Sequence, residues 1–182
     1  MNEHVKSFFE RLEEDLDRAE AEDVEQLLES VQEVFASVLG EGFERIDMLV
    51  DTDEESLSLY LRDIQDIADY ELFTIHSDGT FEPHFRLETS DYHRDTFGFG
   101  ALEDNPDNWF ASRFEDPAEI PWSAFREQQS AFVDELTGWF ENFCVDMETV
   151  YETDEELVEV EKRSNLDHSQ EARVGAQLDE LL

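Results

Sequence analysis

The sequence predicts an α+β fold, and two changes in the spacing of its apolar residues carry that prediction. Apolar residues recur at helical spacing up to about residue 39, alternate with polar residues between about 44 and 88, and return to helical spacing from about 121. We therefore predict an N-terminal αα-hairpin, a four-stranded antiparallel meander, a long C-terminal helix and a short terminal helix. Residues 1–150 are expected to form a single α+β domain, and residues 151–182 an acidic C-terminal extension with an amphipathic helix.

Two helices are predicted in the N-terminal part, over about 3–19 and 23–39. Each has an apolar stripe with acidic residues largely outside it. The second helix should end at Gly40 and Gly42, because glycine readily adopts the left-handed conformation that follows many helices. The short connection at 19–22 predicts that the two helices form a hairpin.

Four strands are predicted in the next segment. Residues 46–50 and 57–61 alternate around an acidic turn, and residues 70–77 and 80–88 flank Asp78-Gly79, a pair that favours a two-residue hairpin turn. With such a turn, the apolar face that packs on the core would carry the following residues: Tyr70, Leu72, Thr74, His76, Phe81, Pro83, Phe85 and Leu87. Pro83 suits an edge strand.

The segment 89–120 reads as a loop that is unusually rich in aromatic residues, so it either packs onto the body or carries a binding surface. A long helix is predicted over about 121–149, with Pro121 well placed for its first turn. Residues 157–163 fit either a strand or an extension of that helix, and Asp167 with Gln170 could cap a last helix. We predict that the partner-binding residues are Phe97, Phe99, Trp109, Phe110, Phe114, Leu178 and Leu181.

The chain is extremely acidic. It has 50 Asp and Glu against 12 Lys and Arg, a formal net charge of -38. Direct nucleic-acid binding needs stripes of basic residues that contact phosphates, and an anionic membrane surface repels such a chain, so we expect neither partner. Because 40% of the residues are hydrophobic and 15 are Phe, the chain should fold despite its charge.

Lysine is depleted more strongly than arginine, with two lysines against ten arginines. Excess carboxylate combined with lysine depletion is typical of cytosolic proteins from organisms that accumulate molar salt, where charge is screened over about 3 Å. Residues 1–20 lack a basic region followed by an apolar run, no long apolar run occurs, and Cys144 is the only cysteine. We therefore expect a cytoplasmic protein of a salt-adapted organism.

No reaction can be assigned from motifs. With 50 carboxylates, pairs that resemble acid–base sites arise by chance, and the acidic turn beginning at Asp51 departs from a calcium loop at Ser56 and Arg62. The best metal candidate is His84 with Asp91 and His93, but surface or half-buried histidines are the simpler interpretation. A two-residue turn puts His76 and His84 on opposite faces of the hairpin, whereas a three-residue turn would reverse this. We predict no catalytic site, no metal and no cofactor.

Three functional hypotheses remain. The first is a non-enzymatic, acidic protein-interaction protein with an adaptor or regulatory role, and such a chain could also form a homodimer. The second is a DNA mimic that occupies the basic cleft of a nucleic-acid-binding protein. A globule of this length is roughly 40 Å across, and the same length of duplex carries about 24 charges. In size and acidity alone, the chain resembles the antirestriction proteins of phages and plasmids. The third hypothesis is an enzyme whose site has no sequence signature.

Overall fold

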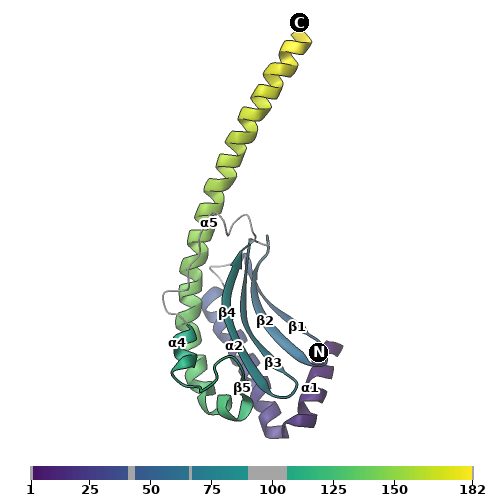
Figure 1. Cartoon of the computed structure of the whole chain (residues 1–182), viewed down its shortest axis with the longest axis vertical. Helices are drawn as coiled ribbons and strands as arrows, with labels where there is room; N and C mark the ends of the chain where they lie inside the picture. The colour runs from purple at the N-terminus through teal and green to yellow at the C-terminus, as the bar shows by residue number, and fades with distance from the viewer. Residues whose placement is uncertain (1, 41–43, 66, 90–105, 182) are drawn as a thin grey trace. The chain divides into compact units, whose positions relative to one another are not determined.

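The computed structural model describes residues 2–40, 44–65, 67–89 and 106–181, with side chains omitted at 89, 153, 154 and 156–181. The chain divides into two compact units, Met1–Cys144 and Val145–Leu182. The sequence predicts a boundary between residues 150 and 151, whereas this division falls after Cys144. The first unit holds two N-terminal helices, an antiparallel sheet and the beginning of the long helix α5, which confirms the predicted α+β class (Figure 1).

The N-terminal αα-hairpin is confirmed, with its turn earlier than predicted. Helix α1 spans Glu3–Asp15 and helix α2 spans Arg18–Leu39. The break comes at Asp17, whose side chain accepts a hydrogen bond from the backbone N–H of Glu20 at 2.8 Å and so caps α2. The predicted connection at 19–22 is therefore the first turn of α2.

The predicted meander is also confirmed. Strands β1 (Ile46–Thr52), β2 (Ser56–Asp63), β3 (Ala68–His76) and β4 (Thr80–Thr89) pair in chain order, each antiparallel to the next. A fifth strand, β5 (Ile120–Pro121), pairs with Thr80 and Phe81 at the start of β4. Two-residue strands carry too little pattern for sequence to predict them.

The register between β3 and β4 differs from the prediction near the turn. Ile75 pairs with Phe81, whereas a two-residue turn at Asp78-Gly79 would pair Ile75 with Glu82. The turn contains residues 77–79, one more than predicted. Gly79 accommodates it with a φ of 85° and donates a hydrogen bond from its N–H to the carbonyl of His76. Ile75 therefore shares the face of Phe81.

A β-bulge then restores the predicted register farther along the strands. The pairing of β3 with both neighbours shifts near Leu72, and Tyr70 pairs with Leu87 as predicted. The predicted core face is thus right for Tyr70 and Phe81 and wrong for Thr74 and His76, which lie on the opposite face. The bulge depends on contacts with β2 and β4, and a single-strand pattern does not encode it.

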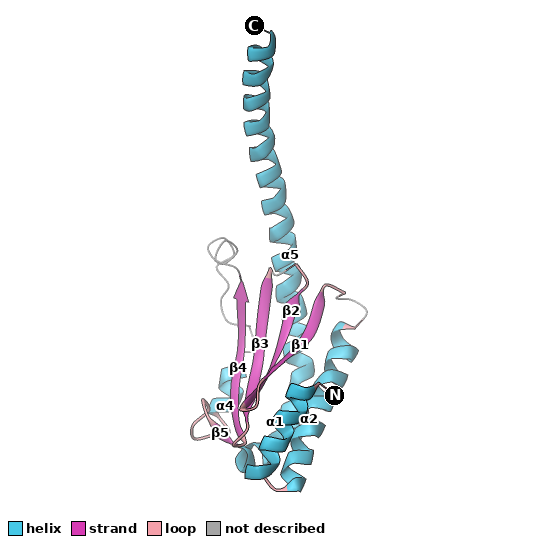
Figure 2. Ribbon diagram, turned by 90° about the vertical axis from the view of Figure 1, so that its right-hand side faces the viewer, coloured by secondary structure: helices cyan, strands magenta, loops and turns pink. Residues whose placement is uncertain are grey.

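One face of the sheet, which we call the inner face, packs against a layer of helices. Helix α2 and the first part of α5 lie on this side of the strands in Figures 1 and 2. Phe132 of α5 lies at the centre of the core, with ring centroids 5.7 Å from Phe81 and 5.8 Å from Trp139. Fully buried aromatic residues dominate the core between the sheet and these helices, namely Phe8, Tyr70, Phe73, Phe81, Phe110, Trp122, Phe125, Phe132, Phe140 and Phe143.

Helix α5 spans Trp122–Leu181 and is preceded by a short helix, α4 (Pro106–Ala111). The predicted start near 121 is correct, whereas the predicted end near 149 and the separate short terminal helix are not, because one helix continues. Residues 157–163 take the helical alternative. The sequence explains this continuity, since it contains no proline after Pro121 and no glycine between Gly138 and Gly175.

Candidate functional site

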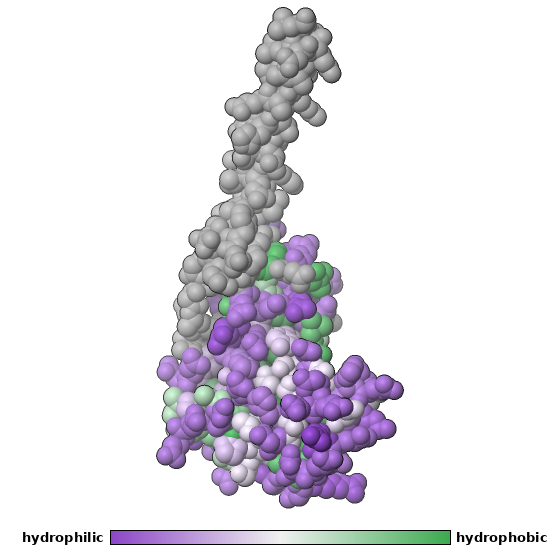
Figure 3. Space-filling view, turned by 45° about the vertical axis from the view of Figure 1, so that its right-hand side comes forward, coloured by the Kyte–Doolittle hydropathy of each residue, from purple (hydrophilic) through white to green (hydrophobic). Residues whose placement is uncertain are grey.

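The helical layer, which we define as α1, α2 and residues 122–144 of α5, is strongly acidic. Residues 3–39 contain twelve acids and three bases, and residues 122–144 contain four acids and one base. Hydrophilic side chains cover much of the described surface in Figure 3. Electrostatic attraction of this layer to a basic surface would be strong at low salt.

The few basic residues of this layer are already paired with their own neighbours. Lys6, Arg11 and Arg18 pair with Glu10, Glu14 and Glu22 within their helices, at 3.9, 3.5 and 3.4 Å. All these groups are exposed, so each pair contributes little to stability. The pairs nevertheless leave no free cation in this layer, within the described residues, to offset its other carboxylates.

Three of those carboxylates form what we call the acidic stripe: Glu25, Glu29 and Glu33 on α2. All three are exposed, and in the described part of the chain none of them forms an ion pair. Residues four apart on a helix are neighbours, and like charges at this spacing cost roughly 0.2–0.5 kcal/mol per pair. Helix α2 therefore repeats an unfavourable arrangement, and no basic side chain among the described residues compensates for it. The i, i+4 spacing was visible in the sequence and could have identified this stripe.

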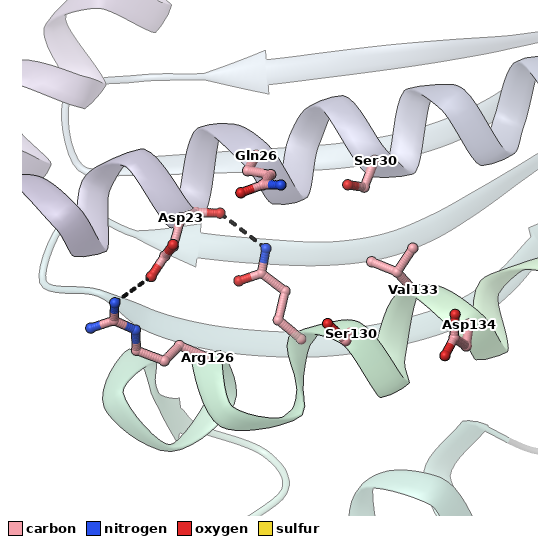
Figure 4. Close-up of a pocket in the computed structure, with 8 residues that line it drawn as sticks. Asp23, Gln26, Ser30, Arg126, Ser130, Val133 and Asp134 are labelled. Atoms are coloured by element: carbon pink, nitrogen blue, oxygen red, sulfur yellow. Dashed lines mark hydrogen bonds and ion pairs between the residues drawn. The ribbon is translucent and has the colours of Figure 1, made fainter.

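A groove between α2 and α5 lies beside the acidic stripe, with a cavity volume of about 330 Å³. At one end, Arg126 binds the carboxylate of Asp23 at 2.7 Å, and the side-chain amide of Gln129 donates to the Asp23 carbonyl at 3.2 Å (Figure 4). Residues Gln26, Ser30, Ser130, Val133 and Asp134 complete its lining. The two bonded contacts join the helices, so the groove is first of all a helix–helix seam.

The second polar region lies on the outer face of the sheet, which no helix among the described residues covers. Neighbouring strands place hydroxyls, a histidine and a carboxylate in a row. The hydroxyls of Ser58 and Thr74 are 2.7 Å apart, and Nε2 of His84 lies 3.1 Å from Thr74 Oγ1 and 3.5 Å from Glu71 Oε1. Thr74 is 7% exposed, so the row is partly shielded from water.

The row does not have the geometry of a catalytic relay. In a nucleophile–histidine–carboxylate triad, the hydroxyl contacts one ring nitrogen and the carboxylate orients the other. Here both Thr74 and Glu71 approach the same nitrogen of His84. The arrangement therefore holds the strands and the histidine in place, and it provides no path for a proton from hydroxyl through imidazole to carboxylate.

His76 occupies the same outer face, where its Nε2 lies 2.8 Å from Glu82 Oε2. The three-residue alternative for the turn is thus correct, and His76 and His84 share a face. The described residues include no group of three or more metal-ligating side chains, and Asp91 and His93 lie outside them. The metal candidate at His84 therefore stays untested at two of its three residues.

Two aspartates stabilise the turns next to His76. Hydrogen bonds from the backbone N–H groups of Glu55 and Ser56, at 2.7 and 2.8 Å, lower the pKa of Asp53 from 3.8. Hydrogen bonds from the side chain and the backbone of Thr80 lower the pKa of Asp78. The nearby His76 adds a smaller effect in the same direction at both carboxylates.

The predicted aromatic binding residues are placed only in part. Trp109 is 9% exposed and Phe110 is 1% exposed, so both pack into the core, which is the alternative that the sequence left open for this segment. Phe114 is half-buried, and Arg113 stacks with its Cζ 4.3 Å from the centroid of Trp109. Phe97 and Phe99 lie outside the described residues, as do the side chains of Leu178 and Leu181. A binding role for these residues stays a prediction.

Comparison of the chain with protein-family models, with curated proteins and with solved structures gives no match. Among the described helices, none combines the length and the apolar character needed to cross a membrane.

Proposed function

We propose that the protein is a non-enzymatic binding protein of a salt-adapted cytoplasm and that it recognises a basic protein surface through its helical layer. The acidic stripe carries this proposal. A helix that repeats uncompensated like charges at i, i+4 spacing breaks a local stability rule, and such departures occur where solvent or function compensates for them. Molar salt or a basic partner would supply that compensation.

A basic protein partner fits this layer better than a small molecule or a nucleic acid. At contact distance, complementary charge selects the right partner and excludes wrong ones, and it does so without requiring a deep pocket. The groove between α2 and α5 is closed at one end by the contacts of Arg126 and Gln129, so the charge of the exposed helix surfaces is the larger feature. On the basis of this surface we propose an adaptor or regulatory role.

Two variants with equal changes in charge test the proposal. The stripe variant carries Glu25→Gln, Glu29→Gln and Glu33→Gln, and the outer-face variant carries Glu71→Gln, Glu82→Gln and Glu88→Gln. Immobilised wild type and both variants are used to capture proteins from the source cell at its native salt. We expect a basic protein that the wild type and the outer-face variant retain and the stripe variant releases. Equal retention by all three would contradict the proposal.

DNA mimicry is a second candidate, because the same charge could occupy the basic cleft of a nucleic-acid-binding protein. The observation in its favour is the net charge of -38, which exceeds the charge of a duplex of comparable length. Competition by duplex DNA for the captured partner distinguishes the two candidate functions. If the chain mimics DNA, duplex DNA will displace it from its captured partner, whereas a partner bound elsewhere will hold the chain and the duplex together.

A further inference from the structure

Strand β1 forms one edge of the sheet. It pairs with β2 along its whole length, and among the described residues no other strand pairs with its second side. The opposite edge is different, because β5 covers the beginning of β4 at Thr80 and Phe81. A seven-residue edge strand presents a row of backbone donors and acceptors to which another chain can add.

The ladder of β1 and β2 shows which backbone groups point outward. Asp53 donates to the carbonyl of Ser56 at 3.0 Å, and Ile64 donates to that of Arg45 at 2.8 Å. Hydrogen-bonded pairs alternate along an antiparallel ladder, so Asp47, Leu49 and Asp51 bond to β2. The groups of the alternate residues, Met48 and Val50 among them, point away from the sheet. Within the described residues, nothing bonds to them.

The side chains of β1 protect this edge from a second copy of the chain but not from a basic segment. The strand contains neither lysine nor proline, which commonly block edges. Asp47 and Asp51 are exposed on the same face as Leu49. An antiparallel copy centred on Leu49 would place Asp47 opposite Asp51, and like charges directly opposite each other are destabilising.

The other face of the strand is apolar. Val50 is 42% exposed and is one of three large hydrophobic residues that are exposed among the described residues, and Met48 is half-buried. A strand beside β1 would therefore meet carboxylates on one face and aliphatic side chains on the other. Side chains alternate between faces along a strand. The complementary sequence consequently alternates lysine or arginine with valine, isoleucine or leucine.

We propose that β1 accepts an extended segment of the partner as an added strand, and that this segment alternates basic and aliphatic residues. The proposal rests on the proposed function, because it assumes a basic protein partner. Main-chain hydrogen bonds to Met48 and Val50 would supply affinity, and the contacts of Asp47 and Asp51 would select the basic residues. The helical layer would attract the partner, and β1 would fix its register.

The test uses the full chain and a fluorescent, end-blocked heptapeptide that alternates lysine and valine, followed by anisotropy at fixed salt. The control peptide has the same sequence with N-methylated backbone nitrogens at alternate residues, which keeps its charge and prevents strand pairing. We expect at least about tenfold weaker binding of the methylated peptide, since tenfold corresponds to roughly one or two hydrogen bonds.

Variants of β1 locate the site. Val50→Pro removes an outward N–H that the β1–β2 ladder does not use, and proline is tolerated on edge strands. We expect it to weaken binding of the lysine–valine peptide about tenfold relative to Val50→Ala, which keeps the donor. A double variant, Asp47→Lys with Asp51→Lys, leaves every backbone group in place. It should lose the lysine–valine peptide and bind a glutamate–valine peptide instead.

Three outcomes would overturn the inference. Equal binding of the plain and the methylated peptide would leave a basic partner in place but remove strand addition. Dimerisation of the free chain in light scattering, abolished by Val50→Pro, would make a second copy the occupant. If the double variant keeps its preference for lysine, the site lies elsewhere. Failure of the proposed function itself would show in a different experiment, the capture from the source cell, in which no basic protein would be retained through the acidic stripe.

Discussion

The helical layer and the outer face of the sheet use charge in opposite ways. On the outer face, Asp69 and Glu88 each lie within 4.0 Å of an arginine of the same sheet, and Glu71 and Glu82 each lie within 4.0 Å of a histidine. In the helical layer, the basic residues are paired with nearby acids, and the acidic stripe has no ion-pair partner in the part of the chain that the structure describes. Several acids of the outer face therefore have partners within the sheet, although Asp47 and Asp51 on the same face have no ion-pair partner among the described residues. The acidic stripe, by contrast, depends throughout on solvent ions or on another molecule.

The first prediction compares the loss of stability on the inner face of the sheet with the loss on the outer face. Phe132→Ala removes the ring at the centre of the aromatic core, so we expect the free energy of unfolding to fall by about 3–5 kcal/mol. Tyr60→Ala on the outer face should cost less, because Tyr60 is only half-buried. Chemical denaturation in about 2 M KCl measures both. Similar losses would contradict the assignment of the faces.

The second prediction concerns the one acid that is fully buried among the described residues. Asp63 accepts a hydrogen bond from the backbone N–H of Gln65 at 2.7 Å and lies 3.5 Å from Arg45. Asp63→Ala should lower the free energy of unfolding by about 2 kcal/mol, since bonds to charged groups contribute roughly 1.5–3 kcal/mol. The same denaturation experiment measures it. An unchanged stability would mean that this carboxylate does not hold the connection to β3.

The third prediction could break the comparison. Glu29→Gln removes the repulsion with both Glu25 and Glu33, so at about 0.1 M salt we expect it to stabilise the protein by roughly 0.4–1 kcal/mol. Glu82→Gln weakens the contact with His76 and should not stabilise the protein. Thermal unfolding followed by circular dichroism compares the two. If Glu82→Gln stabilises as much as Glu29→Gln, the two faces do not differ.

The smallest effect is expected in acid. The pKa values of Asp53 and Asp78 are lower in the folded protein than their ordinary 3.8. Each carboxylate therefore adds stability that is complete above that value and is lost as the pH falls through the lowered one. Replacing either by Asn should shift the midpoint of acid unfolding slightly upward, as fluorescence titration will show. Replacement of exposed Asp15, for which no such bond is found, is the control.

Much of the fold was predictable, because the spacing of apolar residues in each segment matches the helix or strand that the segment forms in the folded protein. The change from helical to alternating spacing located α2 and the four long strands within a few residues. The register near Phe81 was not predictable, because Asp78-Gly79 fits a two-residue turn and the longer turn is offset only farther along, where an extra residue of β4 lies opposite Leu72. That bulge is stabilised by neighbouring strands, and Phe85 on β4 adopts a φ of 46° there.

The candidate sites were less predictable than the fold. Contacts between Thr74 and His84 depend on the register, so an error of one residue moves His84 to a different partner. The i, i+4 spacing of Glu25, Glu29 and Glu33 is visible in the sequence. Only the structure, however, shows that the nearby basic residues pair with other acids and leave these three without an ion pair among the described residues. The burial of Trp109 and Phe110 required the tertiary structure, because aromatic residues in a loop fit a core or a contact surface equally well.

The most direct test is the dependence of the free energy of unfolding on KCl between about 0.1 and 2 M, measured for the wild type, the stripe variant and the outer-face variant. The wild type should gain stability as salt screens the helical layer. We predict a smaller gain for the stripe variant and an unchanged gain for the outer-face variant. An equal salt dependence in all three proteins would contradict the account, since the acidic stripe would then contribute no more repulsion than the paired carboxylates of the outer face.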